Sequence, residues 1–79
     1  MALVPTYFLP TPQTTEIDYN GGTNATYIGT APPGTAVTAA AWTISLLTYD
    51  SNNNVLSVAY ANAGTATNIW NNRASYTYS

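Results

Sequence analysis

The middle of the chain carries its clearest hydrophobic pattern, two alternating runs separated by a polar stretch. Residues 42–49 (WTISLLTY) alternate apolar and polar side chains, as expected of a strand with one buried face. Residues 55–61 (VLSVAYA) alternate again, and the turn-forming residues 50–54 (DSNNN) lie between the two runs. This arrangement predicts a β-hairpin. The apolar face of the first run consists of Trp42, Ile44 and Leu46.

Shorter patterns of the same kind divide the rest of the chain. Turn signals lie at residues 19–22 (YNGG), 31–34 (APPG) and 71–72 (NN). No window shows helical periodicity over more than a turn or two, and turns recur about every 8–12 residues, which is typical of antiparallel β-structure. The sequence therefore predicts an all-β domain over residues 14–79, a small antiparallel β-sandwich or barrel. Its further strands are expected at residues 14–18, 25–30, 65–70 and 73–79.

The first thirteen residues differ from the rest because prolines and bulky apolar side chains are concentrated there. They hold three of the five prolines, and proline fixes φ and removes a backbone donor, which excludes a helix or a central strand. We therefore expect residues 1–13 to form an extended, Pro-rich arm. Such an arm needs a groove on its own domain or on another chain, and we favour another chain. The proposed docking residues are Leu3, Val4, Tyr7, Phe8 and Leu9.

Composition excludes several classes of function. The chain has no His, Cys or Lys, and its single cation is Arg73. A thiol nucleophile, a histidine base and a lysine Schiff base are therefore impossible, as are Cys/His zinc sites and disulfides. One arginine cannot neutralise the phosphates of a nucleic acid, and no apolar run approaches the ~18 residues of a membrane span. We predict no catalytic residues, cofactor or metal site, and neither nucleic acid nor membrane as a partner.

Size and surface chemistry favour a subunit that neighbours stabilise. The chain has 79 residues and a net charge of −2, with only 5% of its residues charged. Thr, Asn and Ser number 14, 9 and 5, so hydroxyl and amide groups dominate the polar positions. A domain this small is marginally stable alone and lacks the residues for disulfides or Cys/His metal sites. We therefore expect a homo-oligomer, or a subunit covered by other proteins of an assembly.

The few charged residues form no convincing active site. Residues 50–54 match the opening of a calcium loop, but Val55 and Ala61 stand where an EF-hand needs Gly and Glu, so a hairpin turn is the favoured interpretation. Glu16 and Asp18 share one strand face and are interpreted as solvated surface acids rather than a glycosidase pair. Arg73 is expected to pair with one of the three acids or to anchor a turn through backbone carbonyls.

Aromatic side chains raise the possibility of carbohydrate binding, because sugars stack on exposed aromatic faces. Trp42 is expected to fill the core instead, since it shares a face with Ile44. The aromatics left as candidates for a surface ligand site are Trp70, Tyr76 and Tyr78.

Several stretches of residues 28–79 form distinctive motifs. The most distinctive is the ending, residues 69–79 (IWNNRASYTYS), which has the pattern W-[DN]-[DN]-R-A-S/T-aromatic. The others are Gly29 with residues 31–36 (APPGTA), residues 41–44 (AWTI) and residues 48–52 (TYDSN). In these motifs, residues 28–79 resemble a family of small tailed-bacteriophage virion proteins. The resemblance carries no catalytic signature and does not include the first 27 residues.

Together, the resemblance and the composition predict a non-enzymatic structural subunit of a virion, assembled in the bacterial host cytoplasm. A capsid decoration protein, a head or tail fibre component, or a collar or adaptor piece would each fit. The expected partners are copies of the chain itself and other virion proteins. The alternative hypothesis is a receptor- or glycan-binding module at a fibre tip.

Overall fold

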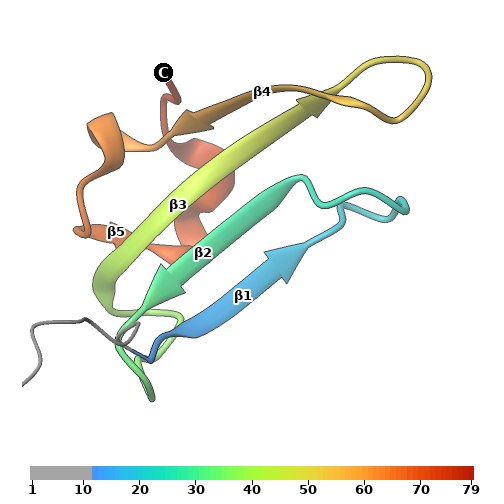
Figure 1. The fold of residues 1–79 in the computed structure, drawn as a ribbon. Helices are drawn as coiled ribbons and strands as arrows, with labels where there is room; N and C mark the ends of the chain where they lie inside the picture. Colours follow the sequence, from blue (N-terminus) through green and yellow to red (C-terminus); the bar gives the residue numbers. More distant parts are fainter. Residues whose placement is uncertain (1–11) are drawn as a thin grey trace, which may run out of the picture.

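Five strands form one antiparallel sheet in the computed structural model, which describes residues 12–79 (Figure 1). The prediction of an all-β antiparallel fold is confirmed. Within this range, no helix is long and apolar enough to cross a bilayer. The strands run in the spatial order β1-β2-β3-β4, and β5 also pairs with β3. The elements are β1 (Thr14–Asp18), β2 (Tyr27–Ala31), β3 (Ala40–Tyr49), β4 (Val55–Tyr60), β5 (Asn68–Ile69) and two 3₁₀ helices, η1 (Asn62–Gly64) and η2 (Trp70–Ser75).

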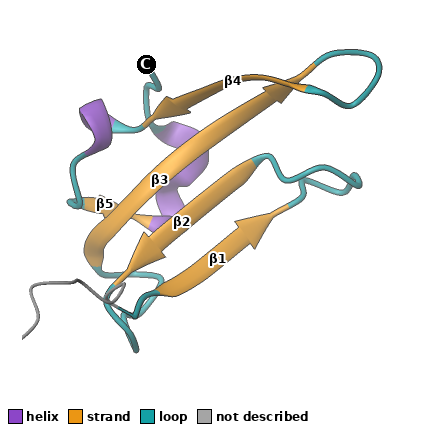
Figure 2. Cartoon of the chain, viewed as in Figure 1, coloured by secondary structure: helices purple, strands orange, loops and turns teal. Residues whose placement is uncertain are grey.

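Strand β3 is the centre of the fold because three other strands pair with it. One edge of β3 pairs with β2. Its other edge is shared, since the first residues, Ala40 and Trp42, pair with β5 and the later ones, from Ser45 to Tyr49, pair with β4. As a result β5 and the helix that follows it, η2, are brought behind the sheet, where they cover one of its faces (Figure 2).

The hydrophobic core lies between that covered face and η2. Trp42 and Ile44 of β3 are completely buried, and Trp70, the first residue of η2, is 5% exposed. The two indole rings pack at a tilt, with 6.0 Å between their centroids. Ala31 and Ala61 complete the buried set. The expectation that Trp42 fills the core is confirmed.

Gly29 of β2 makes room for both tryptophans. A Cβ atom at this position would lie 2.6 Å from Cε3 of Trp70, closer than real Cβ contacts allow, and 3.1 Å from Cε3 of Trp42, which is tighter than most such contacts. Trp70 therefore rests directly on the backbone of β2, a close approach for which an isolated glycine in a strand is typical.

The last third of the chain departs from the sequence prediction. The strand expected at residues 65–70 is reduced to β5, and the tight turn expected at residues 71–72 is part of η2. The strand expected at residues 73–79 begins as η2 and pairs only at its end, where Tyr78 bridges Ala61. The physical reason is that Trp70 leaves the ladder to pack on Gly29, which ends β5 and begins η2.

The close contact at Gly29 generates a stability prediction. Substitution Gly29→Ala should lower the free energy of unfolding by about 2–3 kcal/mol, because one methyl group overpacks the contact with both indoles. Urea titration followed by tryptophan fluorescence measures this value.

Gly22→Ala provides the matched control, because a Cβ at Gly22 would meet only a carbonyl oxygen at 3.4 Å. Its effect should stay within about 0.5 kcal/mol. Equal destabilisation by the two substitutions would show that Trp70 does not rest on Gly29.

Candidate functional site

The aromatic residue Trp70, a predicted surface candidate, lies in the core. It is 5% exposed, and its ring contacts Gly29 and Trp42. The prediction of a surface position is therefore wrong for Trp70. The residue fills the space above a glycine in the sheet, and a buried tryptophan has no free face on which a sugar could stack.

The other two aromatic candidates, Tyr76 and Tyr78, are partly buried and pack against the core. The Ile69 N–H donates a hydrogen bond of 2.8 Å to the Tyr76 hydroxyl, and the Tyr78 hydroxyl donates one of 2.7 Å to the Arg73 carbonyl. The Tyr78 ring also lies 5.7 Å from that of Tyr27, measured between centroids. Both tyrosines therefore hold the C-terminal segment onto the sheet.

Arg73 meets both of the structural roles expected of it. Its Nε donates to the carboxylate of Asp18 at 2.8 Å, and its Nη1 donates to the Trp70 carbonyl at 3.1 Å. Its guanidinium also lies 4.5 Å from the centroid of a Trp70 ring, a cation–π distance. Arg73 thus fastens η2 to β1, with its guanidinium over the indole ring.

Asp18 is the acid that pairs with Arg73, and its side chain stays 24% exposed at the surface. The Asn20 N–H, which donates at 2.7 Å, and then the Arg73 guanidinium lower the pKa of the Asp18 carboxyl. Glu16 lies on the same face of β1, and its pairing position in β2 is Gly29.

Asp50 organises the loop between β3 and β4. Its Oδ1 accepts hydrogen bonds from the backbone N–H groups of Asn52 and Asn54, at 2.8 and 2.9 Å. These donors, Asn54 first, lower the pKa of Asp50. The interpretation of residues 50–54 as a hairpin turn is confirmed. Among residues 12–79, no three acidic side chains come together as a metal site would require.

The fully buried side chain Asn68 was not singled out by the sequence analysis. Its amide nitrogen donates to the carbonyls of Trp42 and Thr65, at 3.0 and 2.7 Å, and its Oδ1 accepts from Asn62. All of its polar atoms have partners, so the amide joins β5, β3 and η1. Nothing in a chain with nine asparagines distinguishes this one by pattern.

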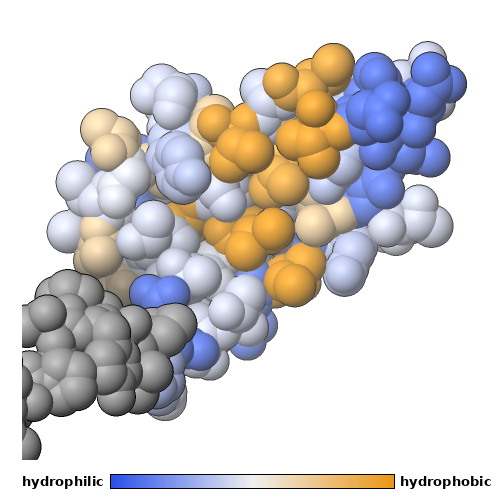
Figure 3. Space-filling view, viewed as in Figure 1, coloured by the Kyte–Doolittle hydropathy of each residue, from blue (hydrophilic) through white to orange (hydrophobic). Residues whose placement is uncertain are grey.

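The most distinctive surface of the domain is the sheet face opposite the core. Six apolar side chains from all four long strands lie there, and we call this set the open face (Figure 3). In register, Ile17 lies opposite Ile28, and Leu47 lies opposite Val58. No element within residues 12–79 covers this set. The open face consists of Ile17, Ile28, Leu47, Leu56, Val58 and Tyr60.

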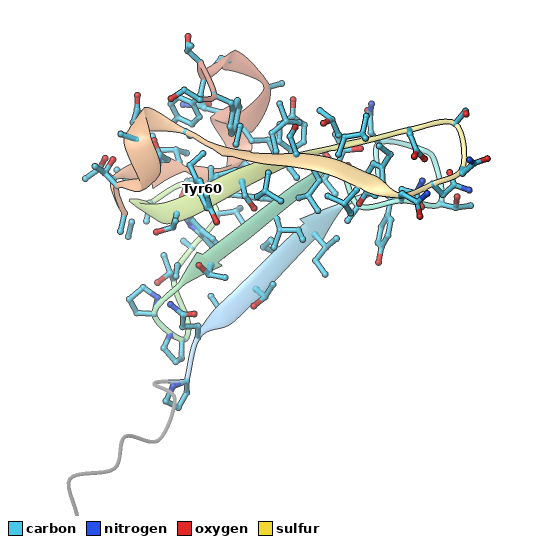
Figure 4. The ribbon with its side chains drawn as sticks, turned by 45° about the horizontal axis from the view of Figure 1, so that its top comes forward. Tyr60 is labelled. Carbon is cyan, nitrogen blue, oxygen red and sulfur yellow. The ribbon has the colours of Figure 1, made fainter. Side chains whose placement is uncertain are left out.

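The outer members of the open face are strongly exposed. Leu56 is 66% exposed, Val58 and Ile17 are each 47%, and Tyr60, labelled in Figure 4 at the end of β4, is 43%. Single exposed apolar residues are ordinary, but a continuous patch on a sheet marks an interaction site. The polar residue in its middle, Ser45, donates to the Ile28 carbonyl and so leaves the patch apolar.

The alternation within the hairpin explains why this face is apolar. Leu46 pairs with Ala59, so the core side of the hairpin receives the smaller residue of β4. Val58 and Tyr60 consequently point away from Trp42.

The five predicted docking residues of the arm, from Leu3 to Leu9, lie outside the described residues.

Comparisons with protein-family models, with curated proteins and with solved structures found no match to the chain.

The buried amide of Asn68 generates a test of the core. In Asn68→Asp, a carboxylate would face two carbonyl oxygens without a donor between them, so stability at neutral pH should fall by about 3–5 kcal/mol. Burial raises the pKa of the introduced carboxyl, so the loss should shrink as the pH falls and the group becomes neutral.

Asn71→Asp makes the same chemical change at an exposed position and should alter stability by no more than about 0.5 kcal/mol. Urea titrations of both variants at several pH values supply the measurement. If Asn68→Asp matched the control at every pH, the amide would have no role in stability.

Tyr78 predicts a loss of stability in alkaline solution. Burial, followed by the neighbouring Tyr27 and Tyr76, raises the pKa of Tyr78 to about 12 from its ordinary 10.0. The folded state thus favours the neutral phenol. The stability gained from keeping this phenol neutral is fully present below about pH 10 and is lost as the pH rises through about 12.

Tyr78→Phe should therefore reduce the alkaline fall in stability. At neutral pH it should cost about 1 kcal/mol, because the Arg73 carbonyl loses its donor. Unfolding curves between pH 7 and pH 12 test both effects. An identical alkaline slope in the two proteins would assign the loss to other groups.

Proposed function

We propose that this chain is a non-enzymatic structural subunit of a tailed-phage virion, built to be covered by neighbouring proteins. The observation that carries the proposal is the open face, an uncharged apolar patch on a sheet whose core lies entirely on the other side. Exposing such a patch to water is unfavourable for a free monomer, and burying it against a neighbour would stabilise a domain of this size.

The strand edges support the same role. Strands β1 and β4 are the outer strands of the main sheet, so each presents backbone groups on one side that another chain could pair with. Among residues 12–79, the contact on these outer edges is at the end of β4, where Tyr60 and Ser79 exchange backbone hydrogen bonds of 3.0 and 3.1 Å. A repeating assembly would give the remaining edge groups partners.

The resemblance to small virion proteins adds the biological setting. Its most distinctive residues, 69–79, run from the last residue of β5 through η2 to the closing segment, and they contribute Trp70 to the core. The proposed role includes three positions in the particle: a capsid decoration protein, a head or tail fibre component, or a collar or adaptor component. No observation favours glycan binding, since Trp70 is buried and Tyr76 and Tyr78 are engaged in the fold.

Quantitative mass spectrometry of purified particles of the phage that encodes the chain tests this function. An isotope-labelled copy of the chain provides the standard, and a phage enzyme of replication provides the control for carried-over lysate. The chain should be present in stoichiometric amount while the control enzyme is absent.

The copy number then assigns the position. Hundreds of copies would indicate capsid decoration, whereas about six to eighteen would indicate a ring or fibre of the neck or tail. Absence of the chain from purified particles would overturn the proposed function.

A further inference from the structure

We infer that the open face is the docking site for residues 3–9 of a second copy of this chain. The inference rests on the proposed function and names the partner of the same surface. Residues 1–11 precede the described part of the chain, and their sequence contains Leu3, Tyr7 and Phe8 among its bulky apolar residues. The domain therefore has an apolar surface to cover and an apolar segment to bury.

The open face and residues 3–9 are alike in having no charged side chain. The chain has only four charged residues, and none belongs to the open face. Asp18 and Arg73 pair with each other, and Asp50 lies in the loop between β3 and β4. Residues 1–13 contain no charged side chain at all. Contact between the two would bury no unpaired charge, which is the costly event at an interface.

The dimensions also agree. Seven residues in an extended conformation, such as residues 3–9, span about 23 Å. Strand β4, with six residues from Val55 to Tyr60, spans about 20 Å. A segment of this length can therefore lie along β4. It can place about one apolar side chain against each of Leu56, Val58 and Tyr60.

The connection to β1 favours a second copy over the chain's own sheet. Only residues 10–13 (PTPQ) lie between Leu9 and Thr14, the first residue of β1. Two of these four are prolines, and each proline disfavours the helical region for the residue before it, which leaves this connection fewer conformations, the extended one among them. If residues 10–13 are extended, residues 3–9 continue past the end of β1, where they can reach the open face of a neighbour more easily than their own.

A complementation experiment with two full-length variants tests the pairing. The arm variant combines Phe8→Ser with Leu9→Ser and keeps the open face. The face variant combines Leu56→Thr with Val58→Thr, which places β-branched residues, suited to a strand, at both positions of β4 and keeps the arm. Sedimentation velocity over a range of concentrations measures association, and the emission of the buried tryptophans checks that both variants are folded.

Wild-type chain should associate as its concentration rises, and each variant alone should show a dissociation constant about tenfold or more higher. An equimolar mixture should form a complex of two chains, because the intact arm of the face variant can dock on the intact face of the arm variant. The control variants Thr6→Ser, in the arm, and Ala74→Ser, exposed on η2, should associate as the wild type does.

Three results would overturn the inference. If the arm variant associated as well as the wild type, the open faces would pack directly on each other. If the mixture remained monomeric while the wild type associated, the arm and the face would not be partners. If the wild type remained monomeric at every concentration, the face would be covered by the chain's own segment or by a different protein.

The particle measurement keeps this inference separate from the proposed function. A monomeric wild-type chain that is abundant in particles would leave the virion role standing and reject the arm as the occupant of the open face. If the two variants complemented each other but the chain were absent from particles, the arm would stand as the occupant of the open face and the virion role would be rejected.

Discussion

The contact of Trp70 with the backbone of Gly29 holds the two layers of this domain together. In a chain with few aliphatic residues, two indole rings supply most of the volume that the core needs, and both lie over a single position without a side chain. The guanidinium of Arg73 lies over the Trp70 ring and pairs with Asp18 of β1. The position of this ring therefore also sets the orientation of η2. The C-terminal segment, its tyrosines and the pairing of Ala61 all depend on that orientation.

This arrangement makes the domain one-sided. A sheet of this size can bury both faces only if it has enough chain to cover both, and here β5 and η2 cover one. On the uncovered face, β4 presents Leu56, Val58 and Tyr60 to water rather than hydroxyl or amide residues. Ser45 also lies on that face, but its hydroxyl donates to the Ile28 carbonyl, so Ser45 does not make the patch polar.

Much of the sheet was predictable because its signals are local. Alternation and turn residues located β1, the hairpin of β3 and β4, and the Asp50 turn. The burial of Trp70 was not predictable in this way, because the six residues of η2 have no apolar period and the ring's place depends on Gly29, forty-one positions earlier. Gly29 itself carried a signal, an isolated glycine between bulky strand residues, which indicates close backbone approach. Asn68 carried none, since a buried amide and an exposed one look alike in sequence. The face to which β4 directs its apolar residues depends on the hairpin register, which alternation alone leaves open.

The position of Arg73 has a consequence for proteolysis. Trypsin cleaves after lysine and arginine, and this chain has a single such residue, so only the Arg73–Ala74 bond can be cut. That bond lies inside η2, and the side chain that the protease must bind is held by Asp18 and the Trp70 carbonyl. Cleavage therefore requires η2 to detach from the sheet, and its rate under conditions of fast reclosing follows the population of that open state. A single proteolytic cut thus reports the opening of one helix.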